Sequence, residues 1–179
     1  YSLSPPLVER STAGEDYWTQ YAPAEAQDNF FLADTAAAGL TVQGAIDTCG
    51  PIISTNTDIK YWLVQGNVDD WAQGACTAVE SAGLGETSCG VTFGGSGLQA
   101  QWDAGVQNCW RYALCTSTFL YAEPILGCCY AIRSGWTNYE DIWPSWVNYN
   151  DCGGEGHTYS SLRLPTTWLT YDDYKQYYE

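Results

Sequence analysis

The stretch DDWAQGACTAVESAGLGETSCGVTF, residues 69–93, joins a predicted helix to a predicted strand. In its first half, apolar residues recur every three or four positions, which predicts an amphipathic helix over 70–82 with Asp69 as its N-cap. In its second half, residues 89–93 combine valine, threonine and phenylalanine, which favour strands. The stretch therefore predicts a fold that mixes helices with short strands.

Similar signals on both sides of this stretch predict further elements. Helices are expected at 35–48, at 96–114, where Ser96 and Gln99 form a capping box, at 124–132 and after Thr170. The other strands are expected at 61–64 and 159–164. The sequence thus predicts an α+β or mainly α fold, a single compact helix-rich domain over residues 1–179 with short strands.

Eight cysteines lie within residues 49–152 of a chain that contains no methionine. An even number of cysteines in a small acidic chain is typical of exported proteins, whose thiols pair in an oxidising compartment. The missing initiator methionine indicates that Tyr1 is a maturation end. We therefore expect a secreted, extracellular protein cross-linked by about four disulfides, with its cysteine-free arms, 1–48 and 153–179, docked on the bridged centre. The connectivity stays open among Cys49, Cys76, Cys89, Cys109, Cys115, Cys128, Cys129 and Cys152.

The formal net charge is −15, from 21 acidic side chains against six basic ones. Such a chain repels phosphate groups, so nucleic acids and anionic membranes are not expected as partners. No segment reaches the roughly 18 uninterrupted apolar residues of a membrane span. The nearest, 119–132, is interrupted by Glu123 and Pro124. In composition alone, acidic and rich in Gly, Thr, Trp and Tyr, the chain resembles small secreted cysteine-rich proteins of fungi.

Glu123 is the acidic residue most closely flanked by apolar neighbours in the sequence. A carboxyl group desolvated by such neighbours has a raised pKa and can act as a general acid. Its position just before Pro124 equally suits a simpler role beside the positive end of a helix. Glycoside hydrolysis would need a second carboxylate roughly 5–9.5 Å away, and the candidates are Asp103, Glu140 and Asp141. An acid-tolerant polysaccharide hydrolase is therefore the alternative function.

The only histidine, His157, lies in a glycine-rich loop with Asp151 and Glu155. One imidazole and two carboxylates fall short of the convergent ligands that a tight metal site needs, so no metal and no cofactor are expected. Residues 94–97, Gly-Gly-Ser-Gly, precede a predicted helix and could hold an anion. They lack the lysine of phosphate-binding loops and are interpreted as a turn.

Aromatic residues are the strongest functional signal, with nine tryptophans and 14 tyrosines. Their rings complete a core that lacks methionine, but their combination of apolar area and polar atoms also suits protein interfaces and sugar rings. We predict an interaction protein rather than an enzyme, of the effector, toxin or extracellular-matrix type. Its partner would be an extracellular protein or a glycan, with self-association as a further option. The predicted binding residues are Trp136, Tyr139, Trp143, Trp146 and Tyr149.

Overall fold

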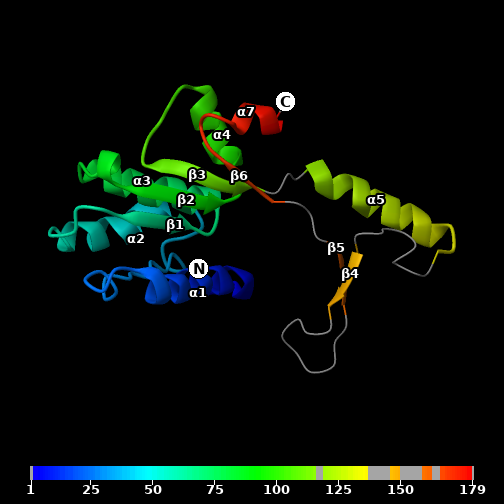
Figure 1. The fold of residues 1–179 in the computed structure, drawn as a ribbon, viewed down its shortest axis with the longest axis horizontal. Helices are drawn as coiled ribbons and strands as arrows, with labels where there is room; N and C mark the ends of the chain where they lie inside the picture. The colour runs from blue at the N-terminus through cyan, green and yellow to red at the C-terminus, as the bar shows by residue number, and fades with distance from the viewer. Residues whose placement is uncertain (1, 116–118, 137–145, 150–158, 163–165, 179) are drawn as a thin grey trace. The chain divides into compact units, whose positions relative to one another are not determined.

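The computed structural model describes residues 2–115, 119–136, 146–149, 159–162 and 166–178 (Figure 1). The chain divides into two compact units. The first consists of Tyr1–Cys115 with Trp168–Glu179, and the second of Thr116–Thr167.

A four-stranded sheet organises the first unit (Figure 1). Its strands, in spatial order, are β1 (Leu63–Gly66), β2 (Cys89–Phe93), β3 (Trp110–Cys115) and β6 (Thr167–Leu169). β1, β2 and β3 run parallel, and α3 (Asp69–Ser81) and α4 (Ser96–Asp103) connect them. Such helices return the chain to the same end of the sheet, as parallel pairing requires. The predicted α+β fold is confirmed, and the helix and strand predicted from residues 69–93 are correct to within one residue.

Helix α3 covers one face of this sheet, and α2 (Val42–Thr55) packs beside it (Figure 1). Two strand glycines allow α3 to approach the sheet closely. A methyl group added to Gly66 would press against Ala72, and one added to Gly90 would collide with Cys76 Sγ. Because of this close contact the middle of α3 is buried, and it joins a core whose largest fully buried side chains are Trp110, Leu98, Val79, Cys76 and Cys109.

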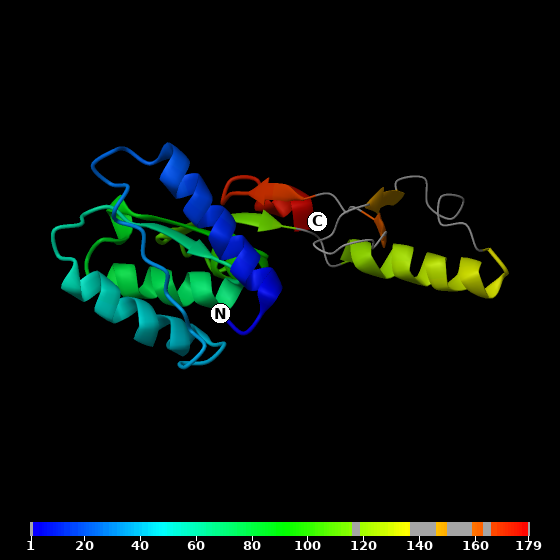
Figure 2. The ribbon, with the colours of Figure 1, turned by 90° about the horizontal axis from the view of Figure 1, so that it is seen from below.

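Helix α1 (Pro5–Tyr21) contacts the opposite face of the sheet (Figure 2). Successive strand residues point to opposite faces, so Gln65 and Phe93 point away from α3. Gln65 Nε2 donates to the Arg10 carbonyl at 2.9 Å, and the Arg10 guanidinium lies 4.1 Å from the centre of the Phe93 ring. No residue of α1 is buried, so polar and cation–π contacts hold this helix in place.

The predicted helix over 35–48 is wrong in its position. Helix α2 begins at Val42, where Thr41 Oγ1 accepts the Gly44 N–H at 3.0 Å, and it continues through Pro51 to Thr55. The predicted cap, Asp34, instead accepts the N–H of Ala36 at 3.0 Å and that of Ser2 at 3.1 Å. The Asp34 side chain therefore stabilises a local turn and does not cap the helix.

The predicted helix over 96–114 is correct only in its first half. Helix α4 ends at Asp103, and Gly105 follows with a left-handed φ of 74°. That conformation stops the helix, and the chain then enters β3. The apolar stripe predicted for one long helix therefore belongs to two elements, a helix and a strand of the central sheet.

The second unit contains α5 (Phe119–Arg133), β4 (Trp146–Tyr149) and β5 (Tyr159–Leu162). β4 and β5 pair antiparallel, with Trp146 opposite Leu162. Helix α5 begins five residues before Pro124, so this proline lies inside the helix. The prediction that Pro124 occupies the first turn is therefore wrong. In the part of the chain that the structure describes, no helix combines the length and apolarity needed to cross a membrane.

Seven of the eight cysteines lie in the described residues, and no two of them form a disulfide there. The predicted cross-linking by about four disulfides therefore stays a prediction. Cys152 lies outside the described residues.

Candidate functional site

A pocket of about 670 Å³ opens in the first unit beside β3. Its walls come from the end of α3, the 3₁₀ turn η1 (Gly85–Thr87), α4, β3 and the turn before α7 (Tyr174–Tyr178). This volume is in the range of small-ligand sites. The lining residues are Glu80, Gly85, Glu86, Trp102, Gln107, Asn108, Cys109, Trp110, Arg111, Tyr112, Thr170, Tyr171 and Asp172.

Aromatic rings form one side of the pocket. Trp102 is buried, and its ring lies edge-on to Tyr171, with centroids 6.2 Å apart, and 5.1 Å from the ring of Tyr174. Tyr171 remains 36% exposed and Tyr112 42% exposed, so both keep ring surface that a ligand can contact. Ring contacts with the buried Trp102 and Tyr174 thus fix the position of Tyr171.

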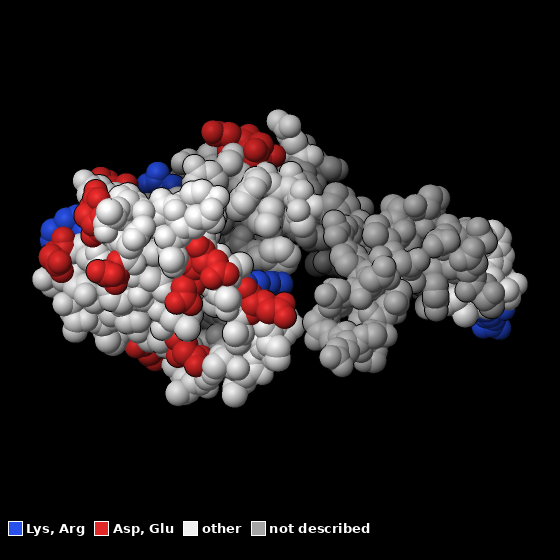
Figure 3. All heavy atoms as spheres, turned by 60° about the horizontal axis from the view of Figure 1, so that its bottom comes forward, with Lys and Arg blue, Asp and Glu red and all other residues white. Residues whose placement is uncertain are grey.

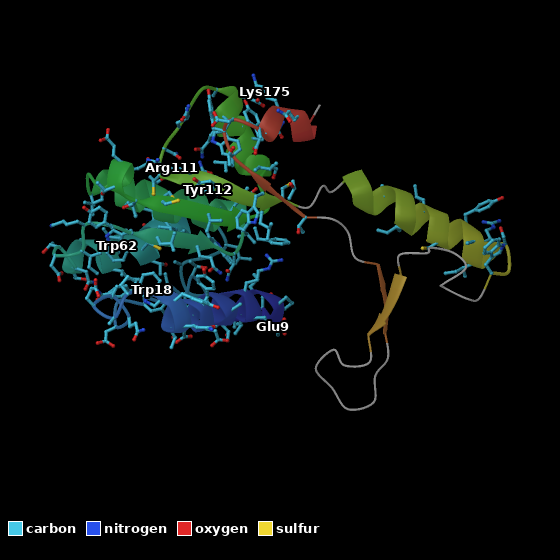
Figure 4. All side chains as sticks on the ribbon, viewed as in Figure 1. Glu9, Trp18, Trp62, Arg111, Tyr112 and Lys175 are labelled. Carbon is cyan, nitrogen blue, oxygen red and sulfur yellow. The ribbon has the colours of Figure 1, made fainter. Side chains whose placement is uncertain are left out.

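Three planar polar side chains lie around these rings. Within the described residues, Glu86, Gln107 and Asp172 line the pocket and have no side-chain hydrogen-bond partner. Arg111 also lines it and donates to the Glu86 carbonyl at 3.4 Å, and it extends from β3 beside Tyr112 (Figure 4). The pocket therefore offers carboxylate and amide groups that are free to bind a ligand.

Other polar side chains of the pocket are already used to build it. Glu80 Oε1 accepts the Cys109 N–H at 2.9 Å, which fixes the start of β3 to the end of α3. Asn108 donates to Gln101 Oε1 at 2.8 Å and accepts the Trp110 N–H at 3.0 Å. These bonds connect the turn before β3 to α3 and α4, so they hold this wall of the pocket in place.

The charge of the pocket is negative. Glu80, Glu86 and Asp172 line it, and Arg111 is the one cation among its lining residues in the described part of the chain. Figure 3 shows acidic side chains spread in several small groups over the visible face of this unit, with few cations between them. The field therefore disfavours anionic ligands and permits neutral or cationic ones.

Of the predicted catalytic and aromatic binding residues, the structure describes the side chains of Asp103 and Trp136, and neither lines this pocket. Asp103, at the end of α4, accepts a hydrogen bond from the Tyr174 hydroxyl at 3.0 Å, so its carboxylate is engaged. Trp136, which follows α5, is 51% exposed. Glu123 lies in α5, and Trp146 and Tyr149 lie in β4, but their side chains are outside the described set. Tyr139, Glu140, Asp141, Trp143 and His157 lie outside the described residues.

The glycine-rich turn 94–97, which the sequence suggested as a site for an anion, binds the carboxylate of Asp69 from the same chain. The Asp69 carboxylate, at the start of α3, accepts the N–H of Gly95 at 2.8 Å and that of Gly97 at 3.0 Å. It also accepts the hydroxyls of Thr92 at 3.2 Å and Ser96 at 3.1 Å. Asp69 was predicted to cap its own helix and Ser96 to cap α4, but the cap of α3 is Val68 and that of α4 is Gly95.

Tyr112, Tyr171 and the free polar groups of the pocket were not predicted as a site. Tyr171 was assigned to the helix expected after Thr170, and Tyr112 to the helix expected over 96–114. The signal in the sequence was the arginine at position 111, next to Tyr112, inside the otherwise apolar run 109–115. Among the described residues, no group of three or more His, Cys, Asp or Glu side chains is placed to hold a metal ion.

Comparison with known proteins gives no family for this chain. No protein-family model matches it, and no curated protein is significantly similar to it. Its function is therefore argued from the pocket alone.

The hydroxyl of Tyr174 gives a pH-dependent prediction for this site. Burial, and then the hydrogen bond to Asp103, raise the pKa of Tyr174 above its usual value of 10.0. A raised pKa in the folded state means that the stabilisation is complete below about pH 10, the pKa of an unfolded tyrosine, and is lost as the pH rises through the folded pKa. Wild-type protein should therefore lose urea resistance above pH 10 more steeply than Tyr174→Phe, which cannot ionise. Parallel curves for the two proteins between pH 8 and 11 would contradict this account.

Proposed function

We propose that this protein is an extracellular binding protein that recognises a glycan through the tyrosine-lined pocket. The observation that carries the proposal is the combination of two exposed tyrosine rings with three unpartnered planar side chains around one pocket. The rings belong to Tyr112 and Tyr171, and the planar groups to Glu86, Gln107 and Asp172.

A sugar fits this combination for a chemical reason. One face of a pyranose ring presents C–H groups, which pack on an aromatic ring, while its hydroxyls both donate and accept hydrogen bonds. Carboxylates accept from such hydroxyls, and an amide both donates and accepts. The negative charge of the pocket favours a neutral or amino sugar over a uronic acid or a sulfated sugar. An extracellular location agrees with the even number of cysteines and the acidic composition.

Binding without hydrolysis is the leading proposal. A hydrolase needs two carboxylates that flank the scissile bond, whereas Glu80 holds a backbone N–H and Asp103 holds a tyrosine hydroxyl. In the described residues, Glu86 and Asp172 are the pocket carboxylates without a side-chain partner, so a hydrolase at this pocket would have to use these two. Its other predicted carboxylates, Glu123, Glu140 and Asp141, stay a separate prediction.

The proposal is tested by a glycan-binding screen of the full chain at pH 4 and pH 7, with neutral, amino and acidic oligosaccharides. We expect binding of a neutral or amino glycan and none of sulfated or uronic-acid glycans. Assay of the same mixtures for new reducing ends separates binding from hydrolysis. No bound glycan at either pH would contradict the proposal, and release of reducing ends would favour the hydrolase.

A further inference from the structure

Three cysteines gather where α3 crosses the sheet. Cys76 lies on α3, Cys89 begins β2, and Cys109 directly precedes β3. Cys76 and Cys109 are 1% and 0% exposed, whereas Cys89 is half-buried. No metal-binding arrangement includes them in the described residues. Buried thiols at one place in a chain with many cysteines are candidates for a covalent bond.

The contacts single out one pair among the three. Cys76 Sγ lies directly over Gly90, where an added methyl group would collide with it, and Gly90 donates its N–H to the Cys109 carbonyl at 2.7 Å. The two thiols also influence each other, since contact with Cys109 raises the pKa of Cys76 and contact with Cys76 lowers that of Cys109. The missing side chain of Gly90 therefore leaves space for Cys76 Sγ directly beside the backbone of Cys109.

Cys89 is less well placed for either partner. It directly precedes Gly90 in β2, and successive strand residues point to opposite faces, so its side chain points away from the face that Cys76 covers. Its sulfur is directed to the Gly90 carbonyl, 4.0 Å away. A bond between Cys76 and Cys89 would have to cross the strand, and the disulfide map below also tests the pairing of Cys89 with Cys109.

We infer that Cys76 and Cys109 form a disulfide that joins α3 to the start of β3. One of the two cysteines attacks a disulfide oxidant, such as oxidised glutathione, as its thiolate and releases one glutathione thiol. The other then loses its proton, attacks the mixed disulfide and releases the second thiol, so two cysteines are oxidised and one disulfide is reduced. Both sulfurs are buried in the folded chain, so the exchange takes place before α3 closes on the sheet.

Because the exchange precedes the packing of α3 on the sheet, neither thiol is buried at that stage, and either of them can attack first as its thiolate. Cys109 also lines the pocket, and the cross-link would hold that wall to α3 whichever ligand the pocket takes.

A disulfide map of the full chain tests the inference. The protein is refolded in a glutathione redox buffer, alkylated in denaturant without reductant, and cleaved after glutamate and aromatic residues. This cleavage places the three thiols on separate peptides, 72–80, 87–93 and 103–110. We expect 72–80 linked to 103–110, with the link lost on reduction. Alkylated Cys76 or Cys109, or a link from either to 87–93, would overturn the inference.

Two variants provide matched controls for the map. Cys89→Ala should keep the link between 72–80 and 103–110, because Cys89 takes no part in it. Cys76→Ala should expose one further alkylated thiol, at Cys109. Loss of the link in a folded Cys89→Ala protein would show that the pairing is wrong, and the wild-type map decides the question even if Cys76→Ala fails to fold.

Discussion

Replacing Asp69 with alanine should lower the free energy of unfolding by about 3 kcal/mol. Its carboxylate accepts four hydrogen bonds, from Thr92, Gly95, Ser96 and Gly97, and so joins the start of α3 to the turn between β2 and α4. Hydrogen bonds to a charged group stabilise a fold by about 1.5–3 kcal/mol each, and their effects are not additive. Removal of the carboxylate also leaves the N–H groups of two glycines without a partner.

Urea unfolding of Asp69→Ala and Asp70→Ala measures this effect with a close control. Asp70 is the next residue of the same helix and is exposed, so its replacement should change stability by less than about 0.5 kcal/mol. Asp69→Asn keeps the shape but turns one acceptor into a donor, and should also lose most of the stabilisation. Equal stabilities for the Asp69 and Asp70 alanine variants would show that the hydrogen bonds of the Asp69 carboxylate do not stabilise the fold.

Replacing Gly90 with alanine should cost about 3 kcal/mol, because the new methyl group has no room. It would collide with Cys76 Sγ and lie only 3.2 Å from Trp110 Cα and 3.5 Å from the Cys109 carbonyl oxygen. Two of these three neighbours are backbone atoms, in Trp110 of β3 and in the residue before it, and they cannot move by a side-chain rotation. The close packing of α3 on β2 therefore has to open.

A double-mutant cycle under reducing conditions isolates this collision. Cys76→Ala removes the sulfur, so Gly90→Ala should cost at least about 1 kcal/mol less in that background than in wild type. Gly50→Ala serves as the control, since Gly50 lies in α2 and a methyl group there meets nothing within 4 Å. That change should stabilise the protein slightly. Additive effects in the cycle would mean that the sulfur does not occupy the space over Gly90.

The sequence allowed the central helix and strand to be predicted because their signals are local. Helix α3 and strand β2 each carry their own periodicity, and both were predicted closely. The prediction of one helix over 96–114 was wrong in its second half. The apolar spacing there fits a helix, but the left-handed Gly105 ends α4, and pairing with β2 places the following residues in a strand. Helix α2 was misplaced because Asp34 serves a local turn instead of a helix.

The pocket could not be predicted because its residues come from distant parts of the chain. Glu86 follows α3, Tyr112 lies on β3, and Tyr171 follows β6, so only the sheet order β1-β2-β3-β6 brings them together. The composition led to the prediction that tyrosine and tryptophan carry the function, and the proposed site keeps that prediction, which the structure does not test. It differs in using Tyr112 and Tyr171 in place of the predicted residues near Trp136.

The most direct test of the proposed function is calorimetric titration of the best glycan from the screen into wild type, Tyr112→Ala and Tyr61→Ala. Tyr112 lines the pocket, whereas Tyr61 is 76% exposed and does not line it, so the two changes remove the same ring from different places. The account predicts that Tyr112→Ala weakens binding roughly tenfold or more, equivalent to about 1.4 kcal/mol, and that Tyr61→Ala binds like wild type. Equal affinities for the two variants, or weaker binding only in Tyr61→Ala, would contradict it.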